Sequence, residues 1–198
     1  MTTFLLMRHA AHDNVGGFLA GRLEGIRLGA AGKAQAGRLA ERLKRERITA
    51  LYCSPRERTR QTAEAIATAF ARLACRPLAA LDEIDFGAWS GRRFAELNDD
   101  PLWRAWNERR SLARTAGGES FLDVQHRMVG ALEGLVQQHA GETVALVTHA
   151  DVIKAAVLYH CGMRLDDWWR IEIAPASITR LAVDGYGARL LGMNETVD

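Results

Sequence analysis

The sequence predicts an α/β fold, a three-layer α/β/α sandwich with a mostly parallel central sheet and a small helical lid insertion. Short apolar runs, such as residues 4–7 and 143–148, have the length and composition of buried strands. Amphipathic patterns with apolar residues at i, i+3, i+4 and i+7 follow these runs and indicate helices. Strands that alternate with helices are typical of a parallel sheet covered on both faces. We expect a single domain over residues 1–198, which is long enough to bury a hydrophobic core.

The first predicted strand covers residues 4–7 and ends in Arg8-His9, where a cation and an imidazole follow an apolar run. A glycine-rich loop over roughly residues 11–29 comes next, and a loop in this position can fold over a ligand. The first helix is expected to begin near residue 31, because apolar side chains recur there with helical spacing. These side chains are Ala36, Leu39, Ala40 and Leu43.

A second strand is predicted over residues 50–53, and the Ser54-Pro55 pair that follows is typical of a helix start. We expect Ser54 to be the N-cap and Pro55 the first helical residue. The apolar face of this helix is Ala63, Ile66, Ala67 and Phe70. Residues 77–81 are expected to form a third strand, which leads into the polar, glycine-containing segment 82–89.

Residues from about 92 to 118 interrupt the alternation of strands and helices. This segment contains Trp103 and Trp106 together with four arginines. The arginines are Arg104, Arg109, Arg110 and Arg114. We interpret the segment as short helices that form a lid over a site. An equally supported alternative is that the two tryptophans, three positions apart, only anchor a surface helix to the body.

The second half of the chain is expected to return to alternating elements. Ser120 with Asp123 three positions later resembles a capping box, which predicts the start of a long helix that ends at Gly141. Its inward face is Phe121, Val124, Met128, Leu132 and Leu135. The β-branched run 143–148 is a predicted buried strand that ends at His149.

The last predicted elements are one helix and three strands. The helix follows His149, and its inward residues are expected to be Val152, Ala155, Ala156 and Tyr159. Strands are expected near residues 169–174, 178–183 and 189–193.

Composition narrows the classes of protein that the chain can belong to. The formal net charge of +2 is too small to indicate a nucleic-acid-binding protein. Cys53, Cys75 and Cys161 are far apart and lack C-x-x-C spacing, so neither a disulfide framework nor a zinc site is predicted. We find no signal-peptide pattern and no apolar run long enough to span a membrane. We therefore expect a soluble, cytoplasmic protein that binds neither nucleic acid nor a membrane.

Two predicted strands, distant in the sequence, end in the same way, with His9 and with His149. If the sheet is parallel there, both imidazoles lie at the edge where α/β proteins bind ligands. Arg58 is placed in the first turn of a helix, where helix N-termini favour anions and a guanidinium binds phosphate bidentately. Three carboxylates follow the third predicted strand among apolar side chains, which raise the pKa of a carboxylic acid toward that of a general acid. They are Asp82, Glu83 and Asp85.

Taken together, these motifs resemble the histidine phosphatase superfamily, which is also called phosphoglycerate mutase-like. The resemblance covers roughly residues 4–160, with the motifs in the family's order. The matching motifs are Arg8-His9, Ser54-Pro55 through Arg58 to Gln61-Thr62-Ala63, Glu83 with Asp85-Phe86-Gly87 and Trp89 to Gly91, Gly117-Gly118-Glu119-Ser120, and Thr148-His149.

The resemblance implies a catalytic role for each of five residues. His9 attacks phosphorus and becomes phosphohistidine, while Arg8, Arg58 and His149 hold the phosphoryl oxygens. Glu83 protonates the leaving oxygen and then helps water attack the phosphoenzyme. Two arginines and an imidazole already neutralise the phosphate, so neither a metal nor another cofactor is expected.

The sequence departs from the family pattern directly after each histidine. Ala10 and Ala150 stand where glycine is usual, which is harmless only if the backbone φ is negative there. Ala11 and His12 replace a polar pair that commonly lines the pocket, and Asn14 lies just beyond. We name His12 and Asn14 as candidate substrate-binding residues, although a solvent-facing loop histidine is an equally good interpretation of His12. Asp151 would repel phosphate, so it is expected to point away.

The segment between Glu83 and His149 is short compared with the one in the mutases of this family, which favours the phosphatase branch. We therefore expect a metal-independent phosphomonoesterase that acts on a small phosphorylated metabolite. Two alternatives are a phosphoglycerate-mutase-type phosphomutase and a catalytically degenerate member that binds phosphorylated ligands. A homodimer is left open.

Overall fold

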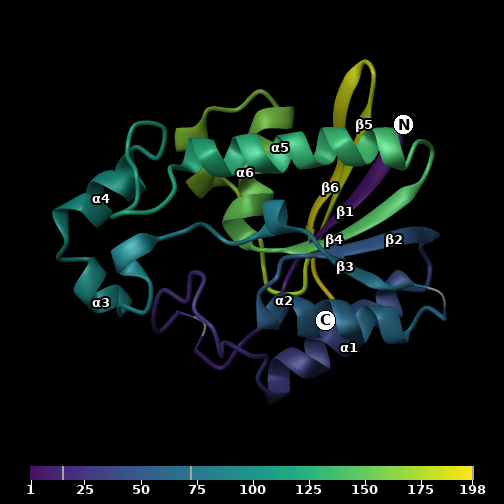
Figure 1. Cartoon of the computed structure of the whole chain (residues 1–198), viewed down its shortest axis with the longest axis horizontal. Helices are drawn as coiled ribbons and strands as arrows, with labels where there is room; N and C mark the ends of the chain where they lie inside the picture. The colour runs from purple at the N-terminus through teal and green to yellow at the C-terminus, as the bar shows by residue number, and fades with distance from the viewer. Residues whose placement is uncertain (15, 72, 198) are drawn as a thin grey trace.

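Six strands form one sheet in the order β3-β2-β4-β1-β5-β6, within a computed structural model that describes residues 1–14, 16–71 and 73–197 (Figure 1). The strands are β1 (Thr2–Arg8), β2 (Ile48–Cys53), β3 (Cys75–Pro77), β4 (Thr143–Thr148), β5 (Ile178–Asp184) and β6 (Gly187–Glu195). The first four strands of this order are parallel, whereas β5 runs antiparallel to β1 and pairs with β6 as a hairpin. The predicted mostly parallel sheet is confirmed.

Helices cover both faces of the sheet (Figure 1). One face is covered by α1 (Ala30–Leu43) and α2 (Glu57–Thr68), the other by α5 (Phe121–Gln138) and α6 (Ala150–His160). Side chains of β1 alternate between the two layers, since Phe4 and Leu6 belong to the core under α5 and α6. Leu5 and Met7 belong to the core under α1 and α2. The three-layer α/β/α sandwich is therefore confirmed.

The strand register brings the functional strand ends to one edge of the sheet. Arg8 pairs with Thr148, so His9 and His149 follow neighbouring positions at the same carboxyl end. Cys53 pairs with Val147, and the next residue, Ser54, donates its backbone N–H to the Val147 carbonyl over 2.9 Å. In open α/β sheets, this edge is where ligands bind.

The third strand is shorter than predicted. β3 covers only Cys75–Pro77, and the 3₁₀ helix η1 (Ala79–Leu81) replaces the rest of the expected strand 77–81. Pro77 has no backbone N–H to continue the ladder, and the chain turns at Leu78, whose N–H bonds to the Cys53 carbonyl.

Two predictions near the C-terminal end are also wrong. Residues 165–170 form the 3₁₀ helix η3 (Leu165–Arg170), and the expected strand 169–174 does not form. Tyr159 is exposed rather than inward. The preceding Leu158 is fully buried, so Tyr159 lies on the outward face of α6. The hairpin strands β5 and β6 include the predicted strand residues 178–183 and 189–193.

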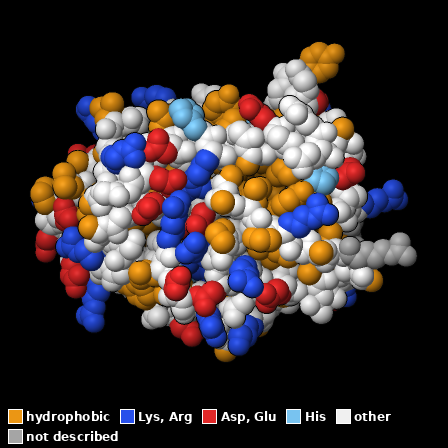
Figure 2. Space-filling view, viewed as in Figure 1, with side chains coloured by type: hydrophobic (Ala, Val, Ile, Leu, Met, Phe, Trp, Pro, Cys, Tyr) orange, Lys and Arg blue, Asp and Glu red, His pale blue; other side chains and the backbone are white. Residues whose placement is uncertain are grey.

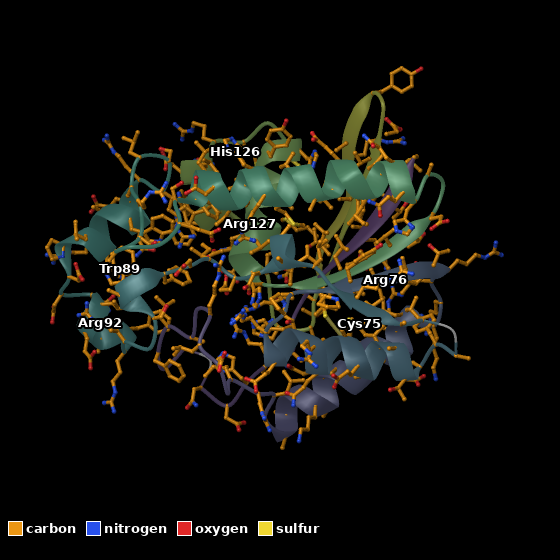
Figure 3. All side chains as sticks on the ribbon, in the orientation of Figure 1. Cys75, Arg76, Trp89, Arg92, His126 and Arg127 are labelled. Carbon is orange, nitrogen blue, oxygen red and sulfur yellow. The ribbon has the colours of Figure 1, made fainter. Side chains whose placement is uncertain are left out.

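The expected lid consists of α3 (Phe94–Leu97) and α4 (Pro101–Glu108), which extend to one side of the sandwich (Figure 1). The 3₁₀ helix η2 (Gly87–Trp89) precedes them in the chain, and Figure 3 shows Trp89 and Arg92 beside these two helices. Trp106 is completely buried, and the Trp103 ring meets Trp89 edge-on at 5.3 Å. The tryptophans therefore anchor these helices to the core, as the alternative interpretation had it.

Truncation of Trp106 is expected to destabilise the whole fold rather than free a hinged flap. Trp106→Ala removes a fully buried indole, and comparable truncations lower the free energy of unfolding by about 3–5 kcal/mol. Urea unfolding followed by circular dichroism measures this loss. Leu102→Ala, in the same helix but 64% exposed, is the matched control and should cost less than about 1 kcal/mol. Equal losses in the two variants would show that α4 does not belong to the core.

None of the helices in the described residues is both long and apolar enough to cross a membrane.

Candidate active site

His9 lies at the end of β1 with its ring orientation fixed by the backbone. Nδ1 is 2.8 Å from the carbonyl oxygen of Ala10, an acceptor, so Nδ1 carries the proton. Nε2 is then unprotonated, and its lone pair accepts a hydrogen bond from Arg58 Nε over 3.3 Å. Burial, reinforced by Arg58 and Arg8, holds the pKa of His9 well below its ordinary value. The ring is therefore neutral near pH 7 and is suited to act as a nucleophile through Nε2.

Arg58 is the buried centre of the pocket and is only 1% exposed. It lies in the first turn of α2, where its Nη2 donates to the carbonyl of Gly21 and contacts His149 Nδ1 at 3.2 Å. Nη1 has no hydrogen-bond partner among the described residues, and the same holds for Nε of Arg8. Buried donors without partners are costly, so these guanidinium groups are arranged to receive an anion.

His149 forms the second wall of the pocket and is fully buried. Its ring centroid is 5.3 Å from that of His9, in an edge-on arrangement. Because Nδ1 accepts from Arg58, Nε2 carries the proton and donates to Ser54 Oγ at 2.8 Å. Ser54 in turn donates to Asp82 Oδ1 over 3.1 Å. This chain of hydrogen bonds fixes the orientation of His149, and burial with Arg58 and His9 lowers its pKa well below the ordinary value.

Ser54 therefore has a different place from the one predicted. It is not the N-cap, since α2 begins at Glu57 with Arg56 as the N-cap. The side chain of Ser54 accepts from the backbone N–H of Arg56, but its main partners are His149 and Asp82. A serine at the end of a strand can cap the following helix or hydrogen-bond to side chains of an active site. The sequence alone does not distinguish these two roles.

Glu83 approaches the pocket from the segment after η1. Its Oε2 is 3.4 Å from His149 Nδ1 and 3.9 Å from Arg58 Nη2. The side chain is 15% exposed, and burial raises the pKa of Glu83 to about 7 even though Arg58 acts in the opposite direction. A carboxyl group with this pKa is protonated in about half of the molecules at neutral pH, as general acid–base catalysis requires.

The backbone of Glu83 is held by a network of charged residues. Its carbonyl oxygen accepts from Arg22 Nε at 2.8 Å and from Arg127 Nη2 at 3.2 Å. Both arginines bond the carboxylate of Glu119, which also accepts from the N–H of Asp85. Basic and acidic side chains alternate across this face of the molecule, and Arg127 lies below α5 on the side that faces the sheet (Figures 2 and 3).

The model of the histidine phosphatase superfamily (branch 1) matches residues 4–196. The chain belongs to this superfamily. Phosphoserine phosphatase 1 of Hydrogenobacter thermophilus is 32% identical over 99% of this chain and 93% of its own length. YhfR of Bacillus stearothermophilus has a TM-score of 0.92 at 30% identity, over 99% of this chain and 98% of its own.

A third relative is mycobacterial glucosyl-3-phosphoglycerate phosphatase in complex with VO3, with a TM-score of 0.88 at 28% identity. The match covers 98% of this chain and 99% of that one. The family and its phosphatase members identify the chain as a histidine phosphatase, an enzyme of the phosphoric monoester hydrolase class.

The two alanines that depart from the usual histidine phosphatase pattern fit without strain. Neither Ala10 nor Ala150 has a positive φ, since the non-glycine residues with positive φ in the described chain are Ala176 and Asn194. Ala10 is fully buried, and its N–H donates to Thr62 Oγ1. These methyl groups give no reason to expect a degenerate site.

The two candidate substrate-binding residues of the loop differ in position. The ring of His12 stacks against that of His9 with centroids 6.0 Å apart, and its buried Nδ1 has no partner in the described chain. Burial, with the charges of Arg58 and Arg8, lowers the pKa of His12. Asn14 is exposed, and its carbonyl accepts from the N–H of Gly17. A role for either residue in binding substrate stays a prediction.

Asp151 was expected to point away from the phosphate. Its carboxylate pairs with Arg110 at 3.1 Å, and its charge adds to burial, the main cause, in raising the pKa of Glu83. Arg110 itself is buried, with its guanidinium 3.5 Å from the ring centre of Trp168. The pairing with Arg110 offsets part of the negative charge of Asp151, which explains how an acidic residue is tolerated beside a phosphate pocket.

The sequence motifs did not predict the roles of Asp82, Arg22 and Arg127 in the site. Asp82 accepts from Ser54 and pairs with Arg56 at 3.0 Å, and Arg22 and Arg127 hold Glu83. The only sequence signal for Arg22 was its place in a glycine-rich loop, and Arg127 lay within an ordinary helix pattern. In the described residues, no group of three His, Cys, Asp or Glu side chains has a metal-binding arrangement.

Proposed function

We propose that this histidine phosphatase is a metal-independent phosphomonoesterase that hydrolyses a small phosphorylated metabolite through a phosphohistidine on His9. The observation that carries the proposal is the pocket around His9 Nε2. Nε2 of this neutral imidazole is unprotonated. It lies beside two guanidinium groups, each with one buried N–H donor, Arg58 Nη1 and Arg8 Nε, that has no partner in the described chain. Such a pocket binds a phosphoryl group and presents a nucleophile to it at the same time.

The first step transfers the phosphoryl group to the enzyme. His9 Nε2 attacks phosphorus in line, the N–P bond forms and the P–O bond to the ester oxygen breaks. Glu83, in its protonated form, gives its proton to that oxygen, so the product leaves as an alcohol. Arg8, Arg58 and His149 hold the phosphoryl oxygens, where charge accumulates in the transition state.

The second step returns the enzyme to its starting state. Glu83, now a carboxylate, takes a proton from a water molecule whose oxygen attacks phosphorus. The P–N bond breaks, inorganic phosphate leaves, and Glu83 is again protonated. A pKa of about 7 lets one carboxyl group perform both proton transfers at neutral pH.

The substrate is proposed from the relatives together with the pocket. One relative is a phosphoserine phosphatase, and another is a glucosyl-3-phosphoglycerate phosphatase. Phosphate monoesters of small carboxylic acids, such as phosphoserine, are therefore the first candidates. The contact of the His12 ring with His9 supports a role for His12 in binding the leaving group.

The direct test is turnover without metal. The protein is incubated in EDTA with phosphoserine, phosphoglycerates, a sugar phosphate and an aryl phosphate, and released phosphate is measured. Rapid quenching in alkali preserves phosphohistidine, which mass spectrometry then assigns to a residue. Phosphate release with phosphorylation of His9 supports the proposal. Isomerised phosphate without release would instead indicate a phosphomutase, and tight binding without turnover would indicate a degenerate member.

A further prediction concerns the pH dependence of the first step. Protonated Glu83 is the active form, so kcat/KM is expected to fall as the pH rises through about 7. The negative charge of Asp151 helps to raise the pKa of Glu83, so Asp151→Asn should lower that pKa. The alkaline limb of the kcat/KM profile should therefore move to lower pH by a few tenths of a unit. Asp99→Asn, an exposed acidic residue, is the control, and a limb that moves to higher pH would contradict this prediction.

The cytoplasmic location and a homodimer both stay predictions.

A further inference from the structure

Two of the three cysteines lie side by side, although the sequence spacing gave no sign of it. Sγ of Cys75 is 2.9 Å from Sγ of Cys53, and the two residues are 22 positions apart in the chain. The third, Cys161, is exposed elsewhere. A disulfide bond is about 2.05 Å long, so the two sulfur atoms need to approach by less than about 1 Å to bond.

The strands that carry these thiols allow such an approach. Cys53 is the last residue of the buried strand β2, and Cys75 is the first residue of β3. In the parallel register, Cys75 stands opposite Leu51, so Cys75 and Cys53 are diagonal neighbours on one face. β3 is three residues long, lies at the edge of the sheet and pairs with β2 alone among the described strands. A short edge strand moves at lower cost than a central one.

A pocket of about 500 Å³ between β3 and α2 reaches the two cysteines, of which Cys75 is partly exposed and Cys53 is buried. It is lined by Cys53, Pro55, Arg60, Glu64, Cys75 and Pro77. Figure 3 shows Cys75 on the side of the sheet that faces α2. The contact between the two sulfurs lowers the pKa of Cys75 and raises that of Cys53, and Arg60 acts to lower both pKa values. Cys75 is thus the thiol that ionises first, and it is also the more exposed of the two.

We propose that Cys53 and Cys75 form a reversible thiol–disulfide site whose oxidant is hydrogen peroxide. The Cys75 thiolate attacks the peroxide oxygen, the O–O bond breaks, and the departing hydroxide takes up a proton as water. The resulting sulfenic acid on Cys75 is attacked by the sulfur of Cys53, so the S–S bond forms and the S–O bond breaks. The Cys53 proton leaves with that oxygen as a second water molecule. Overall, two thiols lose two electrons to one molecule of hydrogen peroxide, and an external dithiol reverses the change.

The bond would tie the edge strand to the strand that leads into the active site. Ser54, which contacts His149, directly follows Cys53 in the chain. Closing a loop of 22 residues also restricts the unfolded chain. For a chain of this size we expect the oxidised form to melt roughly 5–10 °C higher than the reduced form.

Thiol counting by intact mass tests the site. The reduced protein should take up three alkyl groups under denaturing conditions, one for each cysteine in the sequence. After treatment with hydrogen peroxide at low molar excess, only one alkyl group should be added, and dithiothreitol should restore the others. Peptide mapping without reduction should find Cys53 linked to Cys75. Cys161→Ser, the matched control, should still lose two reactive thiols, whereas Cys75→Ser should lose none by this route.

Three results would overturn the proposal. Peroxide-treated protein that still takes up three alkyl groups would show that the thiols do not react. Sulfinic acid on Cys75 with Cys53 still free would show that the second step does not occur. A disulfide through Cys161 between two molecules would assign the chemistry to the exposed cysteine. All three results are read on the wild-type protein, so a variant that fails to fold does not affect them, and none depends on phosphatase activity.

Discussion

Replacing His9 by alanine is expected to lower kcat for phosphomonoester hydrolysis by about 10⁴-fold or more, with no phosphoenzyme formed. The reason is that Nε2 of His9 is the group that the geometry presents to phosphorus. Nε2 is unprotonated because the ring proton lies on Nδ1, which donates to the Ala10 carbonyl. The hydrogen bond from Arg58 to Nε2 fixes the ring from the other side. Removing the imidazole leaves the guanidinium donors in place, so phosphate esters should still bind within about tenfold of the wild-type affinity.

Stopped-time assays of phosphate release, with the phosphoenzyme trapped in alkali, measure this loss. His126→Ala is the matched control, since His126 is exposed on α5 and lies on the opposite side of that helix from Arg127 (Figure 3). It should keep near wild-type kcat. His12→Ala separates the two rings that stack at the pocket, and it should change KM more than kcat. If the phosphoenzyme persisted in His9→Ala, the nucleophile would be another residue, and His12 would be the first to test.

Much of this pocket could be predicted because parallel strands align their ends. Apolar runs before His9 and His149 identified two buried strands, and a parallel register then required both imidazoles to meet at one edge. Arg58 followed from the same logic, since a helix that leaves a neighbouring strand begins at that edge. These predictions need only two things: the apolar pattern of short strands, and the rule that ligands bind at the carboxyl ends of parallel strands.

What could not be predicted depends on contacts between distant segments. Ser54 carries the right chemistry for an N-cap, and only the fold shows that His149 lies within 2.8 Å of it. The ion pair between Asp151 and Arg110 was not predicted, because Arg110 comes from a segment whose packing the sequence did not define. The proximity of Cys53 and Cys75 requires the register of β3 on β2, which a three-residue edge strand does not reveal by its own periodicity.

The Glu83→Gln variant is expected to distinguish substrates by their leaving groups. For an alkyl ester such as phosphoserine, the leaving alkoxide needs a proton, and loss of the acid should lower kcat/KM by about 10²–10³-fold. For an aryl phosphate with an acidic phenol, the leaving group departs without a proton, and kcat/KM should fall less than about tenfold. Glutamine keeps the volume of the side chain, and its amide oxygen can still accept from the N–H of Ile84.

The same variant should also change how the aryl ester is processed. Because Glu83 takes a proton from the attacking water, its loss slows the second step, and phosphohistidine should accumulate after a burst of phenol release. The alkaline limb near pH 7 should disappear from the kcat/KM profile, since the group that titrates there is gone. Glu96→Gln, an exposed residue of α3, controls for the change of charge. Equal losses for alkyl and aryl esters would mean that Glu83 positions His149 and Arg58 without transferring protons. Loss of a proton donor slows the departure of a basic leaving oxygen much more than that of an acidic one.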